Sequence, residues 1–212
     1  MEKKGLCLNM RCMYVLLVLF SISIIISGCN DVEKKTTSEQ ERDPVLIEES
    51  QFGLDPSGGT FYRYSEIKNI GTYEIGPLTA NIETAEAVKG SFKDDYESYN
   101  VNANETIEMI NFHIQFELNK DIEDVSFNQE HIHLKTNTGE KIDTPHELLS
   151  SVVSASILKS PKNNNESYLR QFSFPLQEST LQDIKKVTLI IDAPLDSKGE
   201  PLGEDLEVEV NF

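Results

Sequence analysis

The segment Ile107-Glu108-Met109-Ile110-Asn111-Phe112-His113-Ile114-Gln115-Phe116-Glu117-Leu118 decides the fold class of this chain. Its side chains alternate in character. One face of an extended strand would carry Ile110, Phe112, Ile114, Phe116 and Leu118, and the other would carry Asn111, His113, Gln115 and Glu117. A helix would scatter these residues around its circumference, whereas a period of two is typical of a strand with one buried and one solvated face. The segment therefore predicts a β-strand.

Similar patterns recur through residues 60–212. Strands are predicted at residues 61–70, 72–75, 78–84, 131–135, 140–142, 167–176, 187–191 and 206–212. The turn Gly76-Pro77 separates two of them, and Thr136-Asn137-Thr138-Gly139 indicates a hairpin. These short strands with frequent turns predict an all-β fold, an immunoglobulin-like two-sheet antiparallel sandwich.

Helical signals are few. Thr144-Pro145-His146-Glu147 is a capping box with proline at the first helical position, and it predicts one or two helical turns through Ser151. Residues 152–157 either extend that helix or pair as a strand. The sandwich is therefore expected to carry one or two short helical turns.

Three segments together resemble a known family. They are residues 71–82 (Gly-Thr-Tyr-Glu-Ile-Gly-Pro-Leu-Thr-Ala-Asn-Ile), the strand at residues 109–118, and residues 131–140 (His-Ile-His-Leu-Lys-Thr-Asn-Thr-Gly-Glu). The pattern is similar to the telokin-like, immunoglobulin-fold domains of bacterial surface lipoproteins. The resemblance covers about residues 60–212 and implies a sandwich of largely unknown function, with no catalytic residue to carry over. The chain has no tryptophan and the domain has no cysteine pair, so it departs from antibody-type domains.

The first 28 residues have the three parts of a secretory signal. Lys3, Lys4 and Arg11 make a positive region, and an apolar run follows from residue 13 to residue 26. Ile26-Ser27-Gly28-Cys29 closes this run and resembles the lipobox of bacterial lipoproteins. The resemblance implies cleavage between Gly28 and Cys29 and attachment of diacylglycerol and a fatty acid, such as palmitate, to Cys29. The alternative is an uncleaved N-terminal anchor, although the run is shorter than the roughly 20 residues that span a bilayer.

The cysteine count agrees with lipid anchoring. Cys7 and Cys12 would leave with the leader and Cys29 would carry lipid, so no disulfide is expected in an exported domain. The expected organisation is a signal peptide at residues 1–28, a lipidated cysteine and disordered tether at residues 29–59, and the sandwich at residues 60–212. No cofactor is expected apart from the covalent lipid.

The net negative charge of the chain limits the classes of partner that it can bind. The formal net charge is -17, and removal of residues 1–28, which carry three basic side chains and one acidic side chain, brings it to about -19. Nucleic acid binding needs basic patches, so this charge argues against it. It equally disfavours adsorption to anionic lipid headgroups.

Two groups of side chains are candidates for binding. His131 and His133 lie two residues apart on a predicted strand and therefore share a face, which suits two ligands of a transition metal, with His113 as a third if the strands converge. The alternative is a solvated pair opposite buried Ile132 and Leu134. Phe92, Tyr96 and Tyr99 fall in a long polar stretch and mark a possible contact loop, unless they pack back onto the sandwich.

The sequence contains no phosphate-binding glycine loop and no Gly-x-Ser-x-Gly nucleophile elbow. His146-Glu147-Leu148-Leu149-Ser150 begins like a zinc-protease signature, but serine stands where the second histidine is required. The sequence therefore predicts a non-enzyme: a lipid-anchored binding or interaction domain on the extracytoplasmic face of the cell membrane. Its ligand is unknown and an envelope protein is a possible partner. The alternative is a metal-binding envelope protein that uses His131 and His133.

Overall fold

A computed structural model of the chain describes residues 43–48, 54–55, 57–118, 124–159 and 169–212. The chain divides into two units, Met1–Glu41 and Arg42–Phe212, and every described residue belongs to the second. The predicted signal peptide, Cys29 and most of the predicted tether lie outside the described residues.

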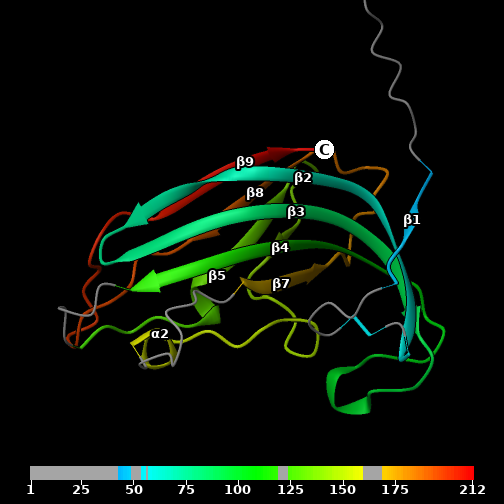
Figure 1. Ribbon diagram of the computed structural model, residues 1–212, viewed down its shortest axis with the longest axis horizontal. Helices are drawn as coiled ribbons and strands as arrows, with labels where there is room; N and C mark the ends of the chain where they lie inside the picture. Colours follow the sequence, from blue (N-terminus) through cyan, green and yellow to red (C-terminus); the bar gives the residue numbers. More distant parts are fainter. Residues whose placement is uncertain (1–42, 49–53, 56, 119–123, 160–168) are drawn as a thin grey trace, which may run out of the picture. The chain divides into compact units, whose positions relative to one another are not determined.

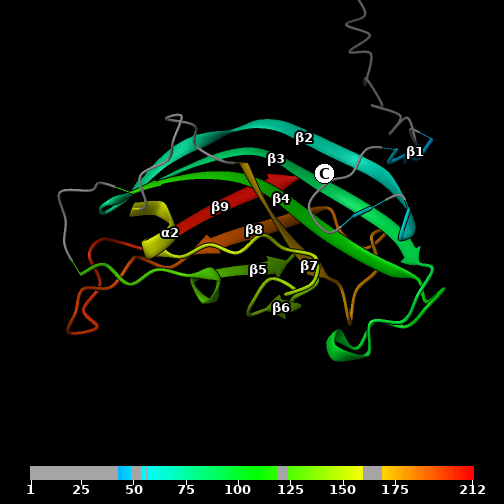
Figure 2. The same ribbon diagram turned by 60° about the horizontal axis from the view of Figure 1, so that its bottom comes forward.

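The second unit is an all-β sandwich of two antiparallel sheets, which confirms the predicted fold class (Figures 1 and 2). The larger sheet has the strand order β1 (Val45–Leu46), β2 (Gly59–Ile75), β3 (Leu78–Phe92), β4 (Ile107–Leu118) and β7 (Leu169–Pro175). The smaller sheet has the order β6 (Lys141–Ile142), β5 (Ile132–Thr136), β8 (Lys186–Ile191) and β9 (Leu206–Asn211). Figure 2 shows the smaller sheet lying beneath the long, curved strands β2, β3 and β4.

The main apolar core lies between the two sheets. The alternating residues of β4 that were assigned to the buried face all belong to it, together with Ile132 and Leu134 of β5. Phe116 packs edge-on against Phe172 of β7, with ring centroids 5.8 Å apart. Burial of this apolar surface is the main favourable contribution to folding.

The β2–β3 hairpin is longer than the sequence indicated. Residues 61–70 and 72–75 form one strand with two register shifts, and β3 continues past residue 84 to Phe92. The predicted Gly76-Pro77 turn is present between Ile75 and Leu78. Gly76 has φ +56°, and a Cβ at this position would collide with the carbonyl of Leu202, so glycine is required there.

A second apolar cluster covers part of the outer face of the larger sheet. It contains Ile47, Leu54, Phe61, Val88, Phe92, Val101, Met109 and Leu149. Ile47 donates its backbone N–H to the carbonyl of Phe61 at 2.9 Å, next to the short β1–β2 pairing. The chain is therefore bound to the sheet from residue 45, within the stretch that was predicted to be tether.

The predicted helix at residues 144–151 is wrong. These residues form a turn that runs along β7: His146 donates its N–H to Ser173, and Ser151 donates its N–H to Gln171, each at 2.8 Å. Pairing with the free edge of β7 satisfies backbone groups that a helix would have satisfied internally. Helix α2 (Ala155–Lys159) begins later, within the stretch for which helix and strand were both open.

Candidate functional site

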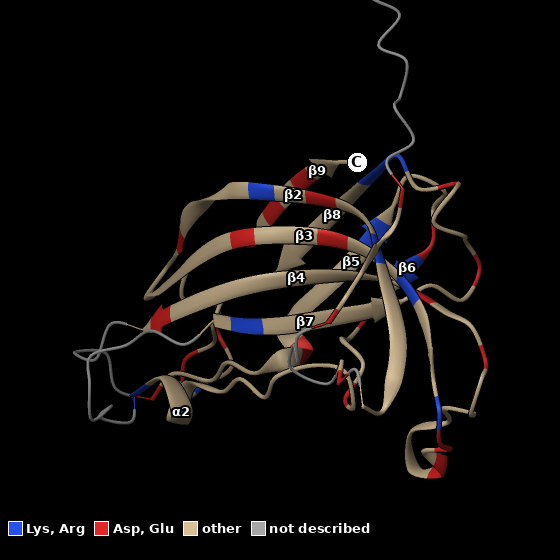
Figure 3. Ribbon diagram, turned by 45° about the vertical axis from the view of Figure 1, so that its right-hand side comes forward, with Lys and Arg blue, Asp and Glu red and all other residues tan. Residues whose placement is uncertain are grey.

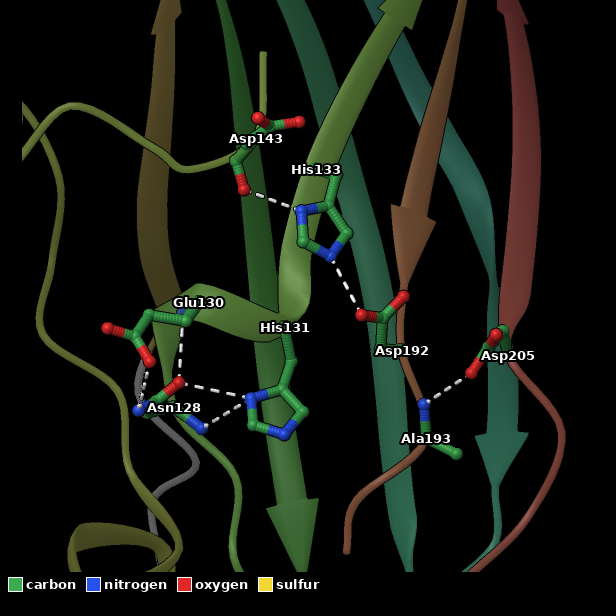
Figure 4. Close-up of polar contacts among 8 residues, drawn as sticks. All are labelled: Asn128, Glu130, His131, His133, Asp143, Asp192, Ala193 and Asp205. Atoms are coloured by element: carbon green, nitrogen blue, oxygen red, sulfur yellow. Dashed lines mark hydrogen bonds and ion pairs between the residues drawn. The ribbon is translucent and has the colours of Figure 1, made fainter. Parts of the chain in front are cut away.

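His133 is held at both ring nitrogens (Figure 4). Its Nδ1 lies 2.5 Å from the backbone carbonyl of Asp143, and its Nε2 lies 2.9 Å from Oδ2 of Asp192. Both partners are hydrogen-bond acceptors, so both ring nitrogens donate when the ring is protonated. Burial alone would lower the pKa of His133, but the bonds to Asp192 and Asp143 outweigh it and raise the pKa above the usual 6.5. A metal ligand needs a nitrogen lone pair, which the protonated ring of His133 lacks.

His131 belongs to a different local structure. It ends the 3₁₀ turn Gln129–His131, and its Nδ1 completes a capping box with Asn128, whose backbone N–H lies 3.3 Å away. The ring also lies against Phe127, with centroids 5.3 Å apart. In Figure 4 the His131 ring turns towards Asn128 and the His133 ring towards Asp192. The two rings therefore serve separate contacts and do not converge on one point.

His113 lies on the opposite side of the sandwich from His133. Its neighbours Phe112 and Ile114 on β4 point into the main core, so His113 faces outward from the larger sheet. Likewise, Ile132 and Leu134 point into the core from β5, so His133 faces outward from the smaller sheet. The expected convergence of His113 with His131 and His133 is wrong, because the apolar core separates the two outer faces.

No group of three histidine, cysteine, aspartate or glutamate side chains within the described residues is arranged to hold a metal ion. His113 is engaged on both sides: Nδ1 lies 2.6 Å from the hydroxyl of Thr84, and Nε2 donates to Oε1 of Gln171 at 3.1 Å. The amide of Gln171 is oriented by its own donation to the carbonyl of Leu149, so Nε2 of His113 carries the hydrogen.

The aromatic residues of the predicted contact loop pack back onto the sheet. Phe92 is 3% exposed, and Tyr96 and Tyr99 are half-buried against the second apolar cluster. The Phe92 ring meets Phe61 and Tyr96 edge-on, at centroid distances of 5.0 and 5.2 Å. The structure therefore supports the alternative reading, in which these rings stabilise the domain.

The sequence pattern did not predict two rows of polar side chains on the outer face of the larger sheet. In the first row, Glu66, Glu86, Asn111 and Ser173 are in register across β2, β3, β4 and β7. In the second row, Lys68, Thr84, His113 and Gln171 are in register across the same strands. The alternation in β4 assigned Asn111 and His113 to a solvated face, but they are 0% and 7% exposed. Lys68 is exposed, and we name the six residues on β3, β4 and β7 (Thr84, Glu86, Asn111, His113, Gln171 and Ser173) the buried polar rows.

The carboxylate of Glu86 is the most unusual group in the buried polar rows. It is 2% exposed and pairs with the guanidinium of Arg63 at 2.8 Å. Burial raises the pKa of Glu86, and the nearby His113 and Arg63 oppose that rise. One sequence signal pointed to this burial: Met109, an apolar residue, stands on the same face of β4 as Asn111.

The predicted lipidation site, Gly28 and Cys29, lies outside the described residues. No helix within the described ranges is long and apolar enough to cross a membrane.

Comparison with known proteins identifies no relative. No family model matches the chain, and no curated protein or solved structure shows significant similarity to it. The resemblance to telokin-like lipoprotein domains thus remains an expectation from sequence.

Proposed function

We propose that this protein is a lipid-anchored, non-catalytic binding domain on the extracytoplasmic face of the cell membrane. The observation that carries the proposal is Ile26-Ser27-Gly28-Cys29 at the end of an apolar run that follows basic residues. Diacylglycerol on the Cys29 thiol and a fatty acyl group on its new amino terminus would supply the two or more chains that stable anchoring requires.

The architecture of the second unit suits an exported domain without disulfides. Cys7, Cys12 and Cys29 all precede residue 43, so the described residues include no cysteine. Two apolar clusters instead hold the unit, one between the sheets and one on the outer face of the larger sheet. A domain of about 150 residues buries enough surface to be stable on this basis.

Three of the four histidines are engaged within the fold. His113, His131 and His133 each bond to a neighbouring side chain or backbone group within the fold. Acidic and basic segments are interspersed along the strands (Figure 3), and the whole chain carries a net charge of -17. These features support a domain that acts through its surface, with a partner other than nucleic acid.

Metabolic labelling with a clickable palmitate analogue tests the anchor. The wild type and a Cys12→Ala control are expected to incorporate label and to enter the detergent phase. Cys29→Ala is expected to lose the label and to accumulate as the unprocessed precursor. Equal labelling of Cys29→Ala and the wild type would overturn the proposal.

Binding is tested separately from anchoring. Photo-crosslinking on intact cells, with the probe introduced at exposed positions of the sandwich, is expected to give a discrete adduct that mass spectrometry can identify. The matched control carries the probe at a buried core position such as Ile114. The absence of any adduct specific to the exposed positions would contradict a binding role while leaving the anchor intact.

A further inference from the structure

Unpartnered polar atoms gather at one place in the larger sheet. Among the described residues, five buried side-chain nitrogen or oxygen atoms have no hydrogen-bond partner. Four of the five are Nε of Arg63, Oε2 of Glu86, and both amide atoms of Asn111. Glu86 and Asn111 are directly opposite in the β3–β4 register, and Arg63 bonds to the other oxygen of Glu86. These atoms therefore belong to one small region.

This region is enclosed on most sides. Asn111 is 0% exposed, as are Met109 on its own strand and Ser173 opposite it on β7. The turn at residues 146–151 closes the β7 side, where Ser173 donates its hydroxyl hydrogen to the carbonyl of Leu149 at 2.9 Å. On the β2 side, the side chains of Arg63 and Glu66 are 22% and 24% exposed. The region is therefore partly open to solvent on the β2 side.

Burying such atoms without a hydrogen-bond partner is energetically unfavourable, because a buried amide or carboxylate loses its hydrogen bonds to water and forms none within the protein. Buried polar groups in native proteins almost always have partners, from the protein or from ordered water. The remainder of the buried polar rows follows this rule: His113, Thr84, Gln171 and Ser173 are all bonded. Glu86 and Asn111 are therefore the exception that requires a partner.

We infer that Arg63, Glu86 and Asn111 form an internal hydration site that binds ordered water. The free atoms include two acceptors, Oε2 of Glu86 and Oδ1 of Asn111, and two donors, the amide nitrogen of Asn111 and Nε of Arg63. Water both donates and accepts, so it satisfies this mixed set. A cation would leave the donors unsatisfied beside a guanidinium, and an anion would meet the carboxylate of Glu86.

Water–protein cross-relaxation NMR on the mature domain tests the site. The Asn111 amide protons are expected to show cross-peaks to water with the sign of a long-lived, bound molecule. A crystal structure at high resolution is expected to show solvent density within hydrogen-bond distance of Glu86 and Asn111. The inference is overturned if Asn111 instead bonds directly to Oε2 of Glu86, or to another protein group, with no solvent between them.

A pair of variants locates the water. Asn111→Leu removes both amide atoms at similar volume and is expected to abolish the bound-water signals in this region. Gln115→Leu makes the same kind of change on the same face of β4, outside the buried polar rows, and is expected to retain them. The NMR and crystallographic measurements on the wild type do not depend on the variants, so they test the inference even if Asn111→Leu does not fold.

Discussion

Nε2 of His133 lies 2.9 Å from Oδ2 of Asp192, which joins strand β5 to the residue that follows β8. The backbone carbonyl of Asp143 lies 2.5 Å from the opposite ring nitrogen, so one imidazole ring connects three segments. The side chains of His133 and Asp192 are 25% and 45% exposed, so solvent weakens the pair. The pair nevertheless has a direct consequence for stability as a function of pH.

The stabilisation from the His133–Asp192 pair is expected to be lost as the pH rises above 6.5. The pKa of His133 in the folded protein is raised above the usual 6.5, so the contribution of the pair is complete below pH 6.5. It disappears as the pH rises through the folded-state pKa. In urea unfolding, the free energy at pH 6 minus that at pH 8 should be larger in the wild type than in His133→Gln by about 0.5–1 kcal/mol. An equal difference in the two proteins would show that another group is responsible.

Glu140 is expected to stabilise the turn that follows β7. It is 6% exposed and accepts the backbone N–H groups of Gln177, Glu178 and Ser179 at 2.7, 3.2 and 3.0 Å. Glu140→Gln should lower the free energy of unfolding by about 1–3 kcal/mol at pH 7, because the amide is a weaker acceptor. The exposed side chain of Glu178 provides the control, and Glu178→Gln should have little effect.

The Glu140 carboxylate also predicts that the stability of the domain falls at acid pH. Burial alone would raise the pKa of Glu140, but the three N–H donors outweigh it and hold the pKa below the usual 4.5. Its stabilisation is therefore present above pH 4.5 and is lost as the pH falls through the folded-state pKa. Thermal melts between pH 3 and pH 6 should show a shallower acid loss in Glu140→Gln than in the wild type.

The second apolar cluster is expected to contribute strongly to stability. Phe92→Ala should cost about 3–5 kcal/mol, since it removes a buried ring from between Phe61 and Tyr96. Tyr64→Ala, at a side chain that is 43% exposed, should change stability by less than about 0.5 kcal/mol. Chemical denaturation of both variants checks this, and a small effect of Phe92→Ala would contradict the assignment of the loop aromatics to a core.

The start of the folded unit can be tested at Ile47. This side chain is 6% exposed, and Ile47→Ala should cost about 2 kcal/mol or more. Val45 is 59% exposed, so Val45→Ala should be close to neutral. If both variants match the wild type in denaturation, residues 45–47 belong to the tether after all.

Zinc is expected to leave the mature domain unchanged. Both nitrogens of His133 lie within hydrogen-bond distance of protein oxygens, and His131 and His113 form other contacts. Calorimetric titration with Zn²⁺ should give no saturable heat in the wild type or in a His131→Ala/His133→Ala double variant. Saturable binding that the double variant loses would restore the metal-binding alternative.

The sequence by itself determined the architecture. The alternation in residues 107–118 identifies the central strand and its core face, because a strand sends successive side chains to opposite faces whatever lies around it. Turn residues such as Gly76-Pro77 likewise act locally, so their positions were readable. The prediction of a helix at residues 144–151 was wrong because backbone N–H groups of this segment bond to the free edge of β7, at residues 169–175.

Only the tertiary structure decided which outer faces are covered. The alternation of apolar and polar residues shows that the two faces of a strand differ. It does not indicate which distant segments of the chain cover the outer face. Ile47, Leu149 and Val101 reach the outer face of the larger sheet from three separate segments, and the turn at residues 146–151 closes its β7 edge. The burial of Glu86 and Asn111, and the separation of His113 from His133 by the core, therefore depend on long-range packing.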